Sequence, residues 1–189
     1  MTRVIAGAAR GRRLTTPPGD DTRPTSDRAR EGLFSTLGSL RGTLAGARVL
    51  DLFGGSGAVG LEALSRGAAS ALLVESDARA AKAIRDNIRL VALPGAELRT
   101  ARAERTVAAP CPDAPYDIVF LDPPYAVTDG DVRALLDAMA ENRWLAPDAL
   151  VAVERATRGG TFAWPDGFAE IRSRRYGEGT LWYGRAAQV

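Results

Sequence analysis

Short apolar runs alternate with segments of helical periodicity from Arg48 onward, and this alternation narrows the possible fold more than any other feature of the chain. The apolar runs predict buried strands at 49–53, 71–74, 116–121 and 150–153, with a weaker strand at 97–100. Between them, apolar side chains recur at helical spacing around 61–65, through 84–91 and over 132–139. Such a chain builds right-handed βαβ units, so we predict an α/β fold in which a mostly parallel sheet carries helices on both faces.

The amino-terminal part of the chain lies outside this alternation. Residues 4–14 predict two short strands around a glycine-containing turn, and residues 15–24 predict a connector rich in proline and aspartate. A helix is expected to begin at Ser26 or Asp27, because apolar side chains then recur at helical spacing, at Ala29, Leu33, Leu37 and Leu40. The opposite face of this helix is predicted to carry Arg28, Arg30 and Glu31.

The carboxyl-terminal part of the chain predicts a closing hairpin, since 168–175 and 180–183 flank the turn residues 177–179. With 189 residues, 46% of them hydrophobic, the chain is long enough to bury one core. We therefore divide it into a basic hairpin and connector over residues 1–24 and one larger domain over residues 25–189.

Two scarce residue types limit the chemistry. Histidine is absent, which excludes triads with a histidine base and histidine-ligated metals. Cys111 is the only cysteine, so no internal disulfide can form and no metal site is expected. Any catalysis must depend on carboxylates, hydroxyls, backbone groups or a bound cofactor. No apolar stretch reaches the roughly 18 to 20 residues of a membrane span and the amino terminus lacks a secretory signal, so we expect a cytoplasmic protein with no membrane partner.

Positive charge gathers near the amino terminus, although the net charge of the chain is only +2. Residues 1–48 contain nine arginines and four acids, and Lys82 is the only lysine of the chain. Arginine pairs bidentately with phosphate and stacks on bases, so this cluster favours an RNA or DNA partner.

A glycine-rich loop, 51–60, follows the first strand of the alternating region and leads into a helix. This is where open α/β sheets bind ligands, because strand ends and a helix amino terminus converge there. Gly55, Gly57 and Gly60 satisfy GxGxxG, and Glu75 ends the second strand 20 positions after Gly55, where a ribose-binding acid is expected. Taken alone, the loop indicates a nicotinamide dehydrogenase as readily as any other enzyme. Asp51, however, opens it with a negative charge that suits an amino-bearing ligand better than a pyrophosphate.

Asp122, Pro123, Pro124 and Tyr125 follow directly on the strand 116–121. A strand that ends in an acid, two prolines and an aromatic offers a carboxylate, backbone carbonyls and a flat ring at one point, which suits a planar amine such as a nucleobase. Hydride transfer has no need of this arrangement, whereas methylation of an amine does. A ligand with an amine near Asp51 and a ribose near Glu75 is then expected, and S-adenosylmethionine fits.

Four segments together resemble the RsmD-type small-subunit ribosomal RNA guanine-N2 methyltransferases: 3–7 with 10–13, 23–34, 51–57 and 122–125. The resemblance covers nearly the whole chain and implies the class I, Rossmann-like methyltransferase fold, a seven-stranded sheet with its last strand reversed. Residues 25–189 would then be the methyltransferase domain. It also implies methyl transfer from S-adenosylmethionine to the exocyclic N2 of one guanine in 16S ribosomal RNA, within a 30S subunit or an assembly intermediate.

The resemblance further implies roles for single residues. Asp51, Gly54, Gly55, Ser56 and Gly57 would hold the methionine part of the cofactor, and Glu75 its ribose hydroxyls. Arg23, Pro24 and Thr25 would close over the cofactor, with the following helix as a lid. The family usually has an acid after the third strand to meet the adenine amine. Here Arg102 stands about there, so this contact is expected from the backbone of Ala103 or from Glu104.

For catalysis we expect Asp122 and the Pro123 carbonyl to accept the two N2 hydrogens, Tyr125 to stack on the base, and Pro123 and Pro124 to stiffen the loop. The predicted RNA contacts are Arg3, Arg10, Arg12, Arg13, Arg28 and Arg30. Two alternatives stay open: a DNA adenine-N6 methyltransferase, which Asp-Pro-Pro-Tyr suits equally, and a non-catalytic RNA-binding assembly factor.

Overall fold

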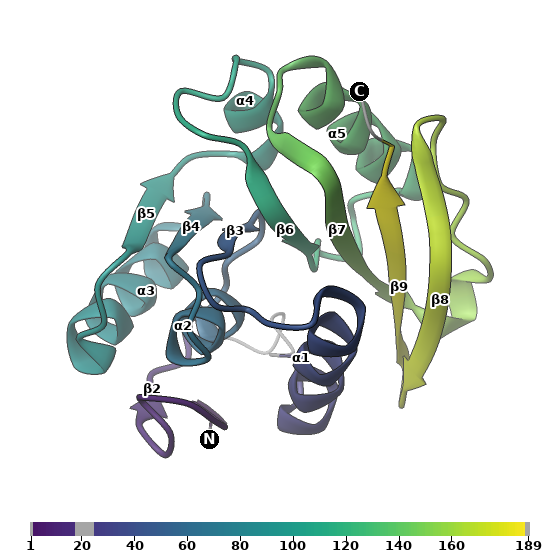
Figure 1. Cartoon of the computed structure of the whole chain (residues 1–189). Helices are drawn as coiled ribbons and strands as arrows, with labels where there is room; N and C mark the ends of the chain where they lie inside the picture. The colour runs from purple at the N-terminus through teal and green to yellow at the C-terminus, as the bar shows by residue number, and fades with distance from the viewer. Residues whose placement is uncertain (1, 18–24, 188–189) are drawn as a thin grey trace.

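A computed structural model describes residues 2–17 and 25–187. Its main feature is a seven-stranded sheet in the order β5-β4-β3-β6-β7-β9-β8 (Figure 1). The strands are β3 (Arg48–Asp51), β4 (Ser70–Glu75), β5 (Ala96–Thr100), β6 (Tyr116–Leu121), β7 (Leu145–Ala156), β8 (Phe168–Tyr176) and β9 (Gly179–Ala186). Strands β3 to β7 pair in parallel, whereas β9 is antiparallel to both β7 and β8. The predicted mostly parallel sheet with a reversed last strand is confirmed.

Helices cover both faces of this sheet, as predicted. The helices are α1 (Asp27–Arg41), α2 (Ala58–Ser65), α3 (Ala78–Val91), α4 (Ala103–Val107), α5 (Asp129–Glu141) and the 3₁₀ helix η1 (Thr157–Gly159). In Figure 1, α1, α2 and α3 lie below the sheet and α4 and α5 above it. Alternate residues of a strand point to opposite faces. Accordingly, Val49 of β3 packs in the same core as Leu33 of α1, while its neighbour Leu50 packs with Leu136 of α5.

Helix α1 begins where the sequence predicts. The Ser26 side chain accepts a hydrogen bond from the Ala29 amide (3.1 Å), which satisfies one of the free amides of the first turn. Leu33 and Leu37 are buried, as predicted. Arg30 is also fully buried, so the prediction that it lies on the exposed face of the helix was wrong. Helical residues four apart share a face, and Arg30 precedes the buried Phe34 by four positions.

The predicted hairpin is present as β1 (Thr2–Arg3) and β2 (Arg13–Leu14), with β1 two residues earlier than expected. The hairpin packs against α2, and Figure 1 shows both below the sheet. The buried Glu62 carboxylate accepts the amides of Ile5 (2.8 Å) and Ala6 (3.0 Å). Glu62 also pairs with Arg66 (2.8 Å) and lies 3.6 Å from Arg30 Nε, so one buried ion cluster joins the hairpin to α1 and α2.

The predicted strand at 150–153 is the central part of a longer one, β7, which begins at Leu145. Pro147 and Asp148, the latter at φ 60°, interrupt the apolar pattern before it. Among the helices of the described residues, none is long and apolar enough to cross a bilayer.

Candidate active site

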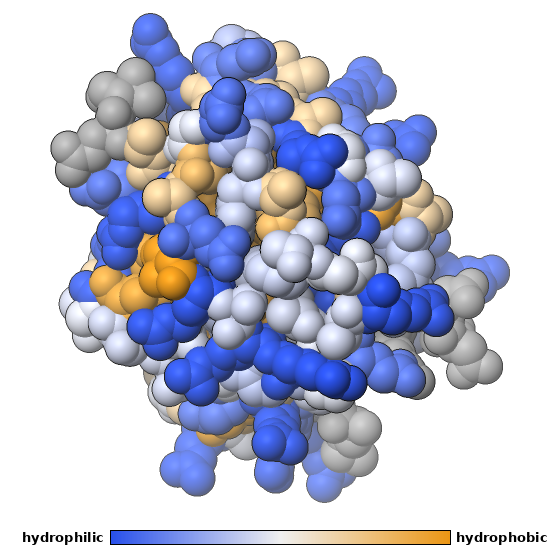
Figure 2. Space-filling model, turned by 90° about the vertical axis from the view of Figure 1, so that its right-hand side faces the viewer, coloured by the Kyte–Doolittle hydropathy of each residue, from blue (hydrophilic) through white to orange (hydrophobic). Residues whose placement is uncertain are grey.

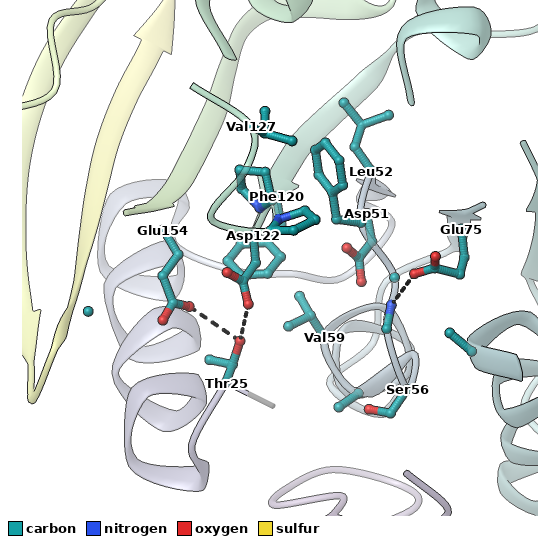
Figure 3. A pocket seen from close by; sticks show the side chains of 18 of the residues that line it. Thr25, Asp51, Leu52, Ser56, Val59, Glu75, Phe120, Asp122, Val127 and Glu154 are labelled. Carbon is teal, nitrogen blue, oxygen red and sulfur yellow. Dashed lines mark hydrogen bonds between the residues drawn. The ribbon is translucent and has the colours of Figure 1, made fainter. Parts of the chain in front are cut away.

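A cavity of about 820 Å³ opens at the carboxyl ends of β3, β4, β6 and β7. Its volume lies within the range of small-molecule sites. It brings together segments that are far apart in the sequence (Figure 3). Of the residues predicted to bind cofactor or substrate, the cavity is lined by Thr25, Arg28, Asp51, Gly54, Gly55, Ser56, Glu75, Ala103, Asp122, Pro123, Pro124 and Tyr125. Gly57 is not among the lining residues, and Arg23 and Pro24 fall outside the described residues.

Four adjacent strands each place an acid at this cavity, at or near their carboxyl ends. In the order of the sheet these acids are Glu75 of β4, Asp51 of β3, Asp122 after β6 and Glu154 of β7, and Figure 3 shows their carboxylates in a row. The first three are predicted from the sequence, whereas Glu154 is not. The signal was nevertheless present, because Glu154 follows the apolar run 150–153 as Asp122 follows 116–121.

The glycine loop fits closely between β4 and α3. Gly55 (φ 57°) and Gly57 (φ 80°) adopt the left-handed conformation that glycine tolerates best, and Gly57 caps α2. A Cβ on Gly54 would lie 2.9 Å from the Ile84 side chain, while one on Gly55 would meet nothing within 4 Å. These glycines are therefore required by backbone conformation and by packing against the core.

Glu75 fixes the loop from the end of β4. Its carboxylate accepts the amides of Gly55 (2.9 Å) and Asp77 (2.9 Å). Each carboxylate oxygen can accept a further hydrogen bond, so Glu75 can hold the loop and still receive hydroxyl donors from the cavity.

Asp51 is 1% exposed, and its Oδ1 atom has no hydrogen-bond partner within the part of the chain that the structure describes. Burial raises the pKa of its carboxyl to about 7, and the negative charge of Glu75 adds to the rise. A buried oxygen without a partner is rare in proteins, and one in a residue that lines a cavity can accept a hydrogen bond from a ligand. An amine or a cation suits it best.

Asp122 and Glu154 share one hydroxyl. Thr25 Oγ1 lies 3.2 Å from Asp122 Oδ2 and 3.3 Å from Glu154 Oε2 (Figure 3). Burial raises the pKa of both carboxyls, and the charge of Glu154 raises that of Asp122 further. A hydroxyl has a single hydrogen to donate, so Thr25 can donate to one of the two carboxyls at a time. Thr25, predicted to close over the cofactor, thus contacts the acids at the Asp122 side of the cavity.

Tyr125 lies at the mouth of the cavity with 67% of its surface exposed, a large exposed aromatic ring. The Arg158 guanidinium is 5.8 Å from the ring centroid. A ring held in this way offers a stacking surface to a planar base. The turn that contains Tyr125 is closed by a hydrogen bond from the Val127 amide to the Pro124 carbonyl (3.0 Å).

The arginines predicted to contact RNA differ in their surroundings. Arg3, Arg10 and Arg13 are exposed on the hairpin, and Arg28 is exposed at the cavity. Arg12 donates to the carbonyls of Leu90 (3.3 Å) and Val91 at the end of α3, where a cation stabilises the helix. Arg30 is buried in its ion cluster and cannot reach a phosphate, which corrects that prediction.

Strand β8 carries a second group of exposed arginines that the sequence did not single out: Arg172, Arg174 and Arg175. The face of the molecule at this end of the sheet is mainly hydrophilic (Figure 2). Charged residues on an edge strand prevent unwanted pairing with other strands, which accounts for this group without a ligand.

Comparison with known proteins yields one family whose model matches this chain, described as "Conserved hypothetical protein 95", over residues 2–185. The chain is 36% identical over 176 residues to the ribosomal RNA small subunit methyltransferase D of Escherichia coli K12, covering 93% of this chain and 85% of that protein. It is also 36% identical over 154 residues to the putative rRNA methyltransferase YlbH of Bacillus subtilis 168, covering 80% of this chain and 81% of that protein.

Solved structures agree with this likeness. The putative methyltransferase yhhF of Escherichia coli superimposes with a TM-score of 0.85 at 33% identity, covering 98% of this chain and 97% of the other. A magnesium protoporphyrin IX methyltransferase of Synechocystis PCC 6803, solved with bound S-adenosylmethionine, is 15% identical with a TM-score of 0.65, covering 85% of this chain and 79% of the other. At that identity the likeness concerns the fold alone.

Proposed function

Because the chain belongs to the RsmD-type family of small-subunit ribosomal RNA methyltransferases, we propose that it transfers a methyl group from S-adenosylmethionine to the exocyclic N2 of one guanine in 16S ribosomal RNA. Its fold is that of the class I methyltransferases. The observation that carries the proposal is the pairing of two features in one cavity: a buried Asp51 oxygen that has no partner among the described residues, and the loop 122–125.

The cofactor fits the donors and acceptors that line this cavity. We assign Asp51 Oδ1 to the ammonium group of the methionine part, because this oxygen lacks a partner among the described residues. The loop around Gly55 would lie against the same part, Glu75 would accept the ribose hydroxyls, and Ala103 or Glu104 would meet the adenine. When bound, S-adenosylmethionine supplies a methyl group on a positively charged sulfur.

The residues 122–125 have to prepare a poor nucleophile, since the N2 lone pair of guanine is delocalised into the ring. Asp122 and the Pro123 carbonyl would accept the two N2 hydrogens and so localise the lone pair on nitrogen. Tyr125 would stack on the base and keep the nitrogen in line with the methyl group. Such alignment contributes several kcal/mol to lowering a barrier.

The amine loses one proton after transfer, because the methylated nitrogen carries a positive charge until then. Asp122 would accept this proton, and the raised pKa of its carboxyl would make it a better base than an exposed aspartate. The target base must be unstacked to reach the cavity. A 30S subunit or an assembly intermediate would present it, and exposed Arg10 and Arg13 on the hairpin suit the surrounding phosphates.

The test uses the wild-type protein, labelled S-adenosylmethionine and small subunits that lack the modification. Nucleoside mapping by mass spectrometry is expected to find N2-methylguanosine at one position. Parallel reactions with double-stranded DNA and with naked 16S RNA act as controls. Methyladenine in the DNA would favour the adenine-methylating alternative, and cofactor binding without any methyl transfer would favour an assembly factor.

A further inference from the structure

The loop 122–125 recognises an amine but does not distinguish guanine from adenine, since both bases carry an exocyclic amine. The two differ at the neighbouring ring nitrogen. Guanine N1 carries a hydrogen next to the N2 amine, whereas adenine N1 presents a lone pair next to its amine. A site for guanine therefore needs a second acceptor close to Asp122.

Glu154 is such an acceptor. Thr25 Oγ1 is 3.2 Å from Asp122 and 3.3 Å from Glu154, so the two carboxylate oxygens lie no more than 6.5 Å apart, the sum of these distances. A guanine edge spans this gap, because its N1–H and N2–H groups each place an acceptor about 2.9 Å away. Both side chains line the same cavity.

The surroundings of Glu154 leave room for its carboxylate, and among the described residues no cation pairs with it. A Cβ on Gly179 of β9 would lie 2.7 Å from Glu154 Oε1, so the absence of a side chain there makes the space. The neighbouring Arg155 turns away to Asp129 (2.7 Å) and to the Val127 carbonyl (2.8 Å). Within residues 2–17 and 25–187, the Glu154 carboxylate accepts a hydrogen bond from the Thr25 hydroxyl.

We propose that Glu154 accepts the N1–H of the target guanine while Asp122 and the Pro123 carbonyl hold its amine, which makes Glu154 the residue that selects guanine over adenine. This assignment rests on the proposed function. Adenine would place a lone pair against the carboxylate of Glu154, and a site built around one hydrogen bond strongly rejects a base that lacks the donor.

The experiment compares guanine with 2-aminopurine at the target position of 16S RNA, introduced by ligation and assembled into small subunits. 2-Aminopurine keeps the 2-amine but carries a lone pair at N1. The single-turnover rate of methyl transfer by the wild type is expected to be about 10- to 150-fold higher for guanine, the worth of one hydrogen bond to a charged group. Equal rates on the two bases would overturn the role of Glu154, whereas methylation of neither base would contradict the proposed function itself.

Variants separate base selection from a structural role. In Glu154→Gln, the side-chain amide can donate to N1 of 2-aminopurine, so the preference should fall to within about threefold. Thr25→Val, which removes the shared hydroxyl but neither acid, should keep the wild-type preference. If Glu154→Gln slows both bases equally, or if Thr25→Val abolishes the preference, Glu154 acts by holding Thr25 and the assignment is wrong. Glu141→Gln, an exposed acid at the end of α5, is the matched control for both rate and preference.

Discussion

Replacing Asp51 with asparagine is expected to remove the pH dependence of cofactor binding and to weaken binding at neutral pH. S-adenosylhomocysteine is the suitable ligand, because it keeps the ammonium group but lacks the sulfonium charge. The ammonium should bind only the ionised form of Asp51, whose pKa in the free protein is about 7. Affinity should therefore rise with pH through about 7 and approach a constant value above about pH 8.

The size of the effect follows from that pKa. At pH 6 about one tenth of Asp51 is ionised, so the affinity of the wild type should be about tenfold lower than at pH 8. In Asp51→Asn the charged partner is lost, which costs about 1.5 to 3 kcal/mol, or about 10- to 150-fold in affinity at pH 8. The side chains have nearly the same shape, so the cavity should keep its form.

Titration calorimetry from pH 5.5 to 8.5 measures both quantities. Below pH 7 the wild type should also release a proton on binding, seen as a heat that depends on the buffer. Glu154→Gln is the matched control, because it removes another acid of the same row and should retain the pH dependence. A wild-type affinity that does not vary with pH, or an unchanged slope in Asp51→Asn, would refute the assignment of Asp51 to the ammonium group.

Two further predictions concern the amino-terminal hairpin. Glu62→Ala should lower the free energy of unfolding by about 3 to 5 kcal/mol in urea titrations, because it removes the buried acid of the cluster and leaves the buried Arg30 paired with the half-exposed Asp27. Glu31→Ala, which removes an exposed acid from Arg66, should cost less than about 1 kcal/mol. A loss of equal size in the two variants would contradict the buried ion cluster. Arg10→Ala combined with Arg13→Ala should weaken RNA binding and reduce the slope of log affinity against log salt concentration by about two. Arg89→Ala, which removes an exposed arginine from α3, should leave this slope unchanged. An unaltered slope in the double variant would remove the hairpin from the RNA-binding surface.

The sheet could be predicted from the sequence because its strands are buried runs of apolar residues. β6 was predicted with its observed bounds, Tyr116–Leu121. Helix α4 (Ala103–Val107) was not predicted, since five residues are too short to display a helical repeat. The amino-terminal part of β7 was missed for a different reason, because Pro147 and Asp148 break its apolar pattern.

Site residues could be predicted where a local sequence pattern identifies them. They could not be predicted where their position depends on a residue far away in the sequence. Asp51, Glu75 and Asp122 all follow apolar runs and all line the cavity. Arg30 pairs with Asp27 on its own helix and with the buried Glu62, a residue of another helix 32 positions later that no local pattern reveals. The same limit applies to Glu154, whose closeness to Asp122 follows from the pairing of β6 with β7.

The central claim, that methyl transfer takes place at the loop 122–125, is tested most directly by Asp122→Ala. The measurement is the single-turnover rate of methyl transfer to unmethylated small subunits, with S-adenosylhomocysteine affinity measured on the same preparation. We predict a rate about 10² to 10⁴ times lower than that of the wild type, together with an affinity within about threefold of the wild-type value. A near-wild-type rate would contradict the claim and place the chemistry elsewhere in the molecule.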